Sequence, residues 1–96
     1  MEIIINRSWG GASITHKLAF ELGVDRYTFD RDDYRIIREV KKDSTLASGL
    51  NSKLCIVEIP DECTDYMISD YDGIETVIYV LGGKLYSDSG DRVGKY

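Results

Sequence analysis

The feature that most constrains the fold of this chain is a short apolar run that ends at its only proline. Residues 53–59 read Lys-Leu-Cys-Ile-Val-Glu-Ile, and Pro60 follows. β-Branched residues favour an extended strand, and proline cannot continue a ladder of backbone hydrogen bonds. Because consecutive side chains of a strand point to opposite faces, this run is apolar on both faces. The sequence therefore predicts a central strand that other elements cover on both sides.

The N-terminal part of the chain predicts a strand, a loop and a helix. Residues 2–6 are short and β-branched, which is typical of a strand. Ser13 is a suitable N-cap for a helix over about 14–22, where Ile, Leu and Leu recur at four-residue spacing. Gly23 then suits the left-handed position that ends a helix.

A second helix is expected over roughly 31–42. Asp30 or Asp32 provides its N-cap, and lysines in its last turn suit the negative end of the helix dipole. Residues 44–52 are rich in Ser, Gly and Asn, so they are expected to form a loop before the central strand.

The C-terminal half predicts a short helix and then a hairpin. Asp61 can cap a helix over about 62–69, with Cys63 and Met67 facing inward. Residues 75–81 and 84–86 read as strands, and Gly82-Gly83 between them is a two-residue hairpin loop.

These elements give the order β-α-α-β-α-β-β, which belongs to the α+β class. The first and central strands are joined through helices, which permits a parallel pair and hence a mixed sheet. At 96 residues the chain suits one small domain. We expect residues 1–86 to form this single domain and residues 87–96 to be a polar C-terminal tail.

The charge balance limits the partners of this chain. Its net charge is −5, made of +1 over residues 1–42 and −6 over residues 43–96. An acidic surface disfavours direct binding to nucleic acid phosphates. The two cysteines do not make a disulfide scaffold, and neither a signal peptide nor a membrane-length apolar run is evident. We therefore expect a cytoplasmic protein with no membrane contact.

Three segments of the chain carry a family resemblance. They are Ile-Asn-Arg-Ser-Trp-Gly-Gly-Ala at residues 5–12, Val-Glu-Ile-Pro-Asp at 57–61 and Asp-Tyr-Asp-Gly-Ile-Glu at 70–75. They resemble a family of small phage and prophage proteins of largely unassigned function. Its members typically carry Ile-Asn-Arg-Cys-Tyr-Gly-Gly-Phe before a capped helix, a strand ending Glu-Ile-Pro-Asp, and then Asp-Tyr-Asp-Gly-Ile-Glu.

The resemblance implies a phage origin and an accessory role in countering a bacterial defence system. This chain departs from the family pattern at Ser8, where the family has cysteine, and at Trp9 and Ala12, where it has tyrosine and phenylalanine. A nucleophilic or metal-binding role of the family's cysteine would therefore not carry over to Ser8.

The loop that joins the first strand to the first helix is the leading candidate binding site. Gly10 and Gly11 would let a ligand approach the backbone, and a glycine-rich turn before a helix suits an anion. Arg7 could pair with a phosphate and Trp9 could stack on a base. The expected ligand-binding residues are Asn6, Arg7, Trp9, Gly10, Gly11 and Ser13. The structural alternative is a tight turn with Trp9 packed over the core.

An acidic segment is the second candidate. Residues 61–75 hold six carboxylates and no Lys or Arg, with tyrosines interleaved. Asp70, Tyr71 and Asp72 could dock on a basic protein partner. The structural alternative is a set of caps and turns on a solvated face.

Catalysis is not expected. His16 is the only histidine, and nothing at helical spacing makes it a metal ligand. We expect no cofactor and no metal. The sequence predicts a phage accessory protein, a homo-oligomer, that binds and sequesters a small anionic ligand such as a nucleotide-type immune signal. The alternative hypothesis is an inhibitor that contacts a host defence protein through the acidic, tyrosine-bearing surface.

Overall fold

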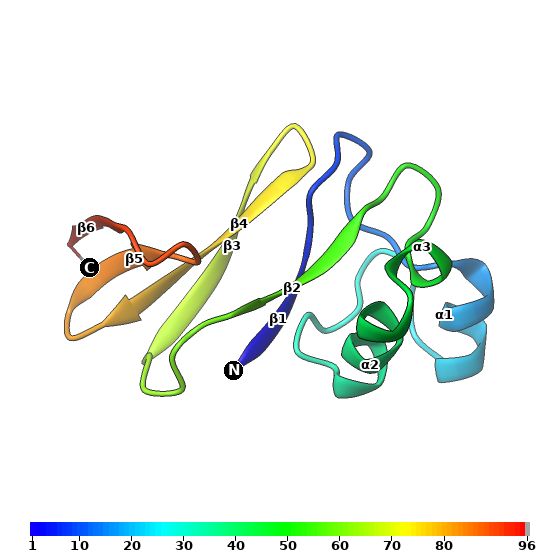
Figure 1. Cartoon of the computed structure of the whole chain (residues 1–96), viewed down its shortest axis with the longest axis horizontal. Helices are drawn as coiled ribbons and strands as arrows, with labels where there is room; N and C mark the ends of the chain where they lie inside the picture. The colour runs from blue at the N-terminus through cyan, green and yellow to red at the C-terminus, as the bar shows by residue number, and fades with distance from the viewer. Residues whose placement is uncertain (96) are drawn as a thin grey trace.

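The computed structural model describes residues 1–95, which form three helices and six strands (Figure 1). The helices are α1 (His16–Leu22), α2 (Tyr34–Lys42) and α3 (Ser44–Ala47). The strands are β1 (Glu2–Asn6), β2 (Leu54–Glu58), β3 (Asp65–Tyr71), β4 (Ile74–Leu81), β5 (Lys84–Ser87) and β6 (Arg92–Lys95). The expected α+β class is confirmed, and the order of elements matches the expected one in outline.

The described strands form two antiparallel sheets, β1-β2 and β3-β4-β5-β6. The expected parallel pair in a mixed sheet is therefore wrong. Glu2 lies opposite Glu58, and Asn6 lies opposite Leu54. The physical reason is visible in Figure 1, where all three helices lie at one end of the molecule, so that β2 begins beside the residue where β1 ends.

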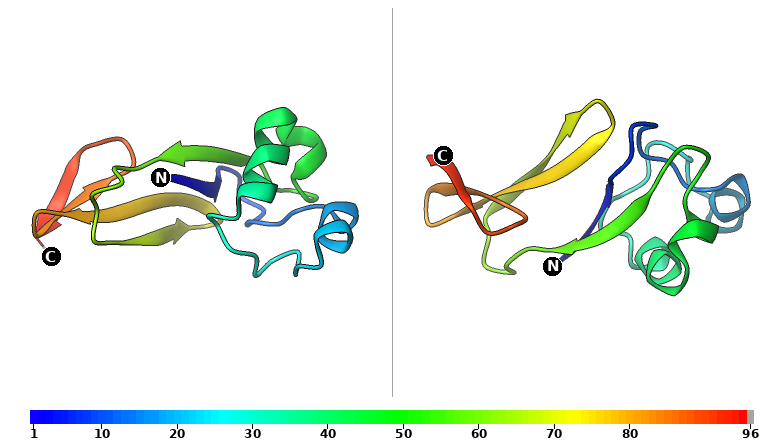
Figure 2. Two further views of the ribbon diagram at one scale, coloured as in Figure 1. Left: turned by 90° about the horizontal axis from the view of Figure 1, so that it is seen from below. Right: turned by 45° about the horizontal axis from the view of Figure 1, so that its top comes forward.

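The prediction that both faces of β2 are covered is confirmed, but its central position is wrong, because among the described strands β2 pairs with β1 alone. Leu54 and Ile4 pack against the helices in one apolar cluster. Val57 and Ile3 point the other way and pack against the face of the four-stranded sheet. The small β1-β2 sheet thus packs on the helices through one face and on the four-stranded sheet through the other. The left view of Figure 2 shows how β1 and β2 lie against β3 and β4.

The helix expected over 62–69 is wrong, because most of this segment belongs to strand β3. Tyr66 and Ile68 face the core while Met67 between them is 60% exposed, which is a two-residue period. β3 pairs with β4 in unbroken register around a turn at Asp72-Gly73, from Tyr71 opposite Ile74 onward. Long-range pairing with β4 therefore decides the conformation of this segment.

The helix starts differ from the expected ones by a few residues. Thr15, not Ser13, caps α1 and accepts a hydrogen bond from the Leu18 amide. Ile14 pairs with Ser48 in an isolated bridge, which keeps the chain extended up to Thr15. Gly23 ends α1 in the left-handed conformation, as expected.

The second helix also begins later than expected. Asp33, rather than Asp30 or Asp32, caps α2. The segment 44–52, expected to be all loop, begins with the single-turn helix α3, whose cap is Asp43.

The hairpin at Gly82-Gly83 is confirmed, with Leu81 opposite Lys84 and positive φ at both glycines. The expected tail is not unpaired over Arg92–Lys95, because these residues form β6 against β5. Tyr96 lies outside the described residues. Among residues 1–95, no helix has the length and apolar character required to cross a membrane.

Candidate functional site

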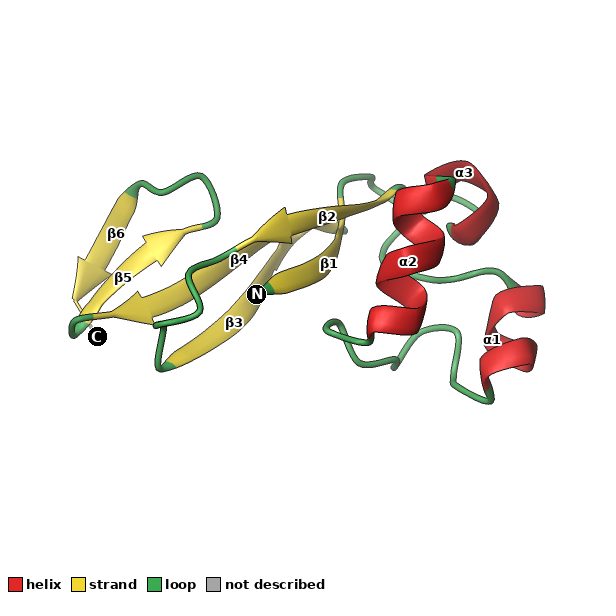
Figure 3. Ribbon diagram, turned by 60° about the horizontal axis from the view of Figure 1, so that its bottom comes forward, coloured by secondary structure: helices red, strands yellow, loops and turns green. Residues whose placement is uncertain are grey.

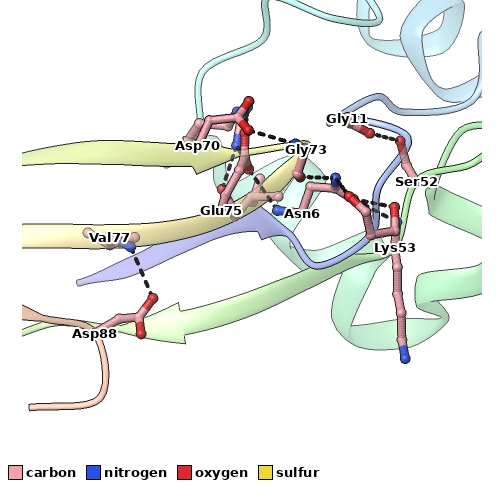
Figure 4. Close-up of polar contacts among 12 residues, drawn as sticks. Asn6, Gly11, Ser52, Lys53, Asp70, Gly73, Glu75, Val77 and Asp88 are labelled. Atoms are coloured by element: carbon pink, nitrogen blue, oxygen red, sulfur yellow. Dashed lines mark hydrogen bonds and ion pairs between the residues drawn. The ribbon is translucent and has the colours of Figure 1, made fainter.

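Three loops meet at one end of the strands: residues 7–15 after β1, residues 48–53 before β2, and the β3–β4 turn at 71–74 (Figure 1). Asn6 joins them. Its buried side-chain amide donates to the carbonyls of Ser8, at 2.9 Å, and Gly73, at 2.6 Å, while its Oδ1 accepts from the Lys53 amide at 2.8 Å (Figure 4). Asn6 is fully buried, so it fixes the loops in place rather than facing solvent.

Ser13, the other polar residue expected to read a ligand, is also buried. Its hydroxyl shares a hydrogen bond of 2.9 Å with that of Ser52, and the Ser52 hydroxyl donates to the carbonyl of Gly11. The Ser13 carbonyl accepts from the amide of Gly49 at 2.9 Å. Ser13 thus attaches the first loop to the second.

Close backbone contacts explain two of the glycines. A Cβ on Gly10 would overlap the backbone of Asn51, so the close approach at this position is to the chain itself. Gly73 has φ of 88°, and a Cβ there would lie 2.7 Å from both the Gly11 amide nitrogen and the Trp9 carbonyl oxygen. The 71–74 turn is therefore packed directly against the Trp9 loop, and the two candidate sites of the sequence are neighbours.

Trp9 remains exposed although its loop is fixed on both sides. Its exposed fraction is 68%, so the alternative of an indole packed over the core does not hold. Trp9 borders a shallow hollow of about 500 Å³ whose other lining residues are Ser8, Gly10, Asn51 and Ser52. Within residues 1–95, the backbone amides of Trp9 and Gly10 donate no hydrogen bond. We call this place the Trp9 hollow.

Two residues of the Trp9 hollow, Asn51 and Ser52, were not singled out by the sequence. They belong to a loop about forty residues further along the chain. Ser8 holds this loop at the hollow, because its hydroxyl donates to the Asn51 carbonyl at 2.6 Å. The one local signal is Asn51 itself, whose φ of 65° is left-handed, a conformation in which asparagine is enriched.

Arg7 lies next to the hollow in sequence but is already paired. Its Nη2 lies 3.1 Å from Oδ2 of Asp88, whose side chain is only 8% exposed and also accepts from the Val77 amide at 3.0 Å (Figure 4). The Arg7 side chain as a whole is 41% exposed. Asp88 therefore holds the Arg7 guanidinium in place and partly neutralises its positive charge.

The acidic turn has mixed roles. Asp70 accepts from the Gly73 amide at 2.7 Å, which fixes the turn, and Asp72 adopts a left-handed φ of 52°. Tyr71 is 76% exposed. Glu75 does not belong to the acidic surface, because it is buried and binds Arg31.

Among residues 1–95, no three His, Cys, Asp or Glu side chains gather closely enough to hold a metal ion. Burial raises the pKa of the Cys55 thiol, which the positive charge of Arg7 only partly offsets, so this cysteine stays protonated at neutral pH. No protein-family model, curated protein or solved structure matches this chain.

Proposed function

We propose that this protein acts by binding, and that the Trp9 hollow holds a small ligand with a flat ring and an anionic group, as a nucleotide has. The observation that carries the proposal is the 68% exposure of Trp9 on a loop fixed by partly buried hydrogen bonds. The ordered backbone already holds this large apolar ring in contact with water. Binding of a partner therefore costs little further conformational entropy of the loop.

The indole supports binding of a ring. Stacking of a nucleobase on an aromatic side chain contributes about 1–3 kcal/mol and tolerates different bases. Trp9 lies at the rim of a shallow hollow, so a flat ligand can cover the indole and exclude water from it.

The neighbouring backbone supports binding of an anion. The amides of Trp9 and Gly10 have no acceptor within residues 1–95, and successive free amides form a concave site for negative charge. Arg7 and the exposed Lys53 flank these loops in sequence, but neither side chain lines the Trp9 hollow, so the backbone amides carry this part of the proposal. The start of α1 contributes nothing here, because this seven-residue helix begins only at His16.

The family resemblance gives this binding a role. A phage accessory protein that holds a nucleotide-type immune signal of its bacterial host would withdraw the signal from its receptor without turnover. A net charge of −5 agrees with a small ligand rather than a nucleic acid strand.

Thermal unfolding in the presence of ligands tests the proposal. Purified protein is heated with mononucleotides, cyclic dinucleotides, nucleosides and inorganic phosphate. At a hundredfold excess over Kd a ligand stabilises the folded state by about 2.7 kcal/mol. We expect stabilisation by a nucleotide, lost in Trp9→Ala and kept in Phe20→Ala, which removes a still more exposed aromatic ring from α1. A wild-type profile unchanged by every nucleotide contradicts the proposal.

A second candidate function is favoured by Tyr71, which is 76% exposed beside the Trp9 loop. Tyr71 with Asp70 and Asp72 would contact a basic surface of a host defence protein. Asparagine at position 70 can still accept from Gly73, and asparagine tolerates the left-handed position 72. The double variant Asp70→Asn, Asp72→Asn should therefore fold normally and lose salt-sensitive capture of a partner from host lysate. Undiminished capture would exclude this function.

A further inference from the structure

Among the described strands, β3 is paired on one side only. It is an edge of the four-stranded sheet, with β4 as its neighbour (Figure 3). Val77 of β4 donates its amide to Asp88, on the side away from β3. Ile68 lies opposite Val77, and alternate residues of an antiparallel strand face alternate neighbours, so Tyr66, Ile68 and Asp70 direct their backbone groups to the open side. The Tyr66 amide already donates to the Asp65 carboxylate at 2.8 Å, which leaves the amides of Ile68 and Asp70 for a partner.

This open edge lacks most of the usual protection, since Asp65 and Asp70 are the only charged side chains of the strand. Natural edge strands are guarded by lysine, proline, a bulge or a very short length. β3 has seven residues, Asp-Tyr-Met-Ile-Ser-Asp-Tyr, with neither lysine nor proline, and its register against β4 is unbroken. The backbone of Ile68 at its centre is therefore available to a further strand.

The two faces beside this edge differ in character. On the outer face, a hollow of about 140 Å³ is lined mainly by apolar side chains, among them Met67, Ile78, Val80 and Leu85. Met67 is 60% exposed, and these four side chains belong to neither apolar cluster of the core. An aliphatic side chain of a partner fits this outer hollow.

The inner face beside the edge is acidic. Tyr66 lies there close to the 30–32 segment: its pKa is raised first by burial and then by the negative charges of Asp32 and Asp30. Asp70 projects from the same face of β3 as Tyr66, since it lies four residues further along the strand. Basic side chains of a partner would be favoured on this face.

We propose that the edge of β3 accepts an extended segment of another protein as an added strand, and that this segment alternates basic with aliphatic side chains. The alternation follows from the two faces, because successive side chains of the added strand point to opposite sides. Main-chain hydrogen bonds supply the attachment, and the two rows of side chains supply the selectivity.

The charges on β3 favour a basic partner over a second copy of this chain. Residues 61–75 contain no Lys or Arg, and Asp65 and Asp70 lie on the strand itself. Pairing two copies along β3 would bring these carboxylates together without a cation from either strand, which opposes self-association.

Titration with synthetic peptides tests the proposal. The probe is a short peptide that alternates lysine with valine. Its controls are the same peptide with glutamate in place of lysine, and the lysine peptide with N-methylated backbone at alternate residues. We expect the lysine peptide to bind and to slow hydrogen exchange of the Ile68 and Asp70 amides. The glutamate and N-methylated peptides should bind at least about tenfold more weakly.

Two protein variants complete the experiment. Met67→Lys places a cation on the exposed edge and should weaken binding by about tenfold or more. Val93→Lys adds the same charge at an exposed residue of β6, the other edge of the sheet, and should bind as the wild type does. Trp9→Ala should also bind normally, which separates this surface from the Trp9 hollow.

Three results would overturn the proposal. The first is the absence of binding by the lysine peptide. The second is equal binding of the N-methylated peptide, which would show charge attraction without strand addition. The third is a wild-type dimer that Met67→Lys converts to a monomer in analytical ultracentrifugation, which would assign the edge to a second copy.

Discussion

The guanidinium of Arg31 binds the carboxylate of Glu75 through two parallel hydrogen bonds, Nη1 to Oε1 at 2.6 Å and Nη2 to Oε2 at 2.9 Å. The Arg31 guanidinium also donates to the Ile4 carbonyl, and the Glu75 carboxylate accepts from the backbone amide of Asn6. One ion pair thus ties the segment before α2, strand β1 and strand β4 together. It holds the four-stranded sheet against the remainder of the protein just below the three loops of the Trp9 hollow.

Replacing Glu75 should cost far more stability than replacing an exposed partner. The Glu75 side chain is 6% exposed and that of Arg31 is 18% exposed. Glu75→Gln leaves the buried guanidinium without its counter-charge, so we expect a loss of about 3 kcal/mol in urea unfolding. Glu39→Gln, which breaks the exposed 3.8 Å pair with Arg38, should cost below about 0.5 kcal/mol. Equal losses would contradict the role given to Glu75.

Asn6 should be a stability residue whether or not a ligand is present. Asn6→Ala leaves the carbonyls of Ser8 and Gly73 and the Lys53 amide without their partner in a partly buried place, and we expect a loss of about 2–4 kcal/mol. Asn6→Asp directs a carboxylate at the same carbonyls and should destabilise the protein as well. Chemical denaturation of ligand-free protein measures both. Unaltered unfolding curves would show that the three loops are held together by other contacts.

Two glycines of the site, Gly10 and Gly73, should tolerate no side chain, whereas Gly94 of β6 should tolerate one. Gly73→Ala meets the Trp9 loop backbone and also strains a positive φ, and Gly10→Ala overlaps Asn51, so both should lose more than about 2 kcal/mol. Gly94→Ala, whose Cβ makes ordinary contact with Leu85, should stay within about 0.5 kcal/mol of the wild type. Thermal unfolding of the three variants compares them, and comparable melting temperatures would refute the packing described.

Asp33 should make stability depend on acid pH. Side-chain hydrogen bonds from Arg35 hold the pKa of Asp33 below its ordinary value, and burial opposes them only in part. A carboxyl with a lowered folded-state pKa contributes stability above its unfolded pKa of about 3.9, and the contribution is lost as pH falls through the folded value.

The variant Asp33→Asn isolates this contribution, since asparagine still caps α2. It should be less stable than the wild type by about 0.5–1 kcal/mol at pH 7. The difference should shrink steadily below about pH 4, where the wild-type carboxyl becomes protonated. Urea unfolding between pH 7 and pH 2 follows it. A difference that stays constant across this range would rule out the Arg35 contact as its source.

Elements with local signals could be predicted from the sequence. The apolar run of residues 53–59 predicted correctly that both faces of β2 are covered, because Leu54 and Val57 pack into opposite clusters. The Gly82-Gly83 hairpin was also predictable, since both residues need positive φ. In each case the physical reason for the element lies in a few adjacent residues.

Strand β3 shows where local reasoning was insufficient. Cys63 and Met67 lie four residues apart, which fits a helix, but Tyr66 and Ile68 can both reach the core only in a strand. Asp72-Gly73 is a dipeptide typical of two-residue hairpin loops, and its two positive φ values place it at the tip of a hairpin. Recognising that tip would have paired 65–71 with 74–80.

The candidate site was predictable only in part. The exposed loop around Trp9 has a glycine signal, and the structure leaves its indole open. The burial of Asn6 and Ser13 and the arrival of Asn51 and Ser52 depend on contacts between loops about forty residues apart. Nothing within a short window of sequence encodes these contacts.

Fluorescence of Trp9 tests the central claim most directly, because it is the only tryptophan in the chain and reports on this hollow alone. Acrylamide quenching first establishes that the indole is open to solvent. The nucleotides of the thermal screen are then added, one in each titration. The account predicts a saturable change in emission with at least one nucleotide, together with protection from acrylamide. Emission that stays constant with every nucleotide, from an indole that acrylamide quenches freely, would contradict it.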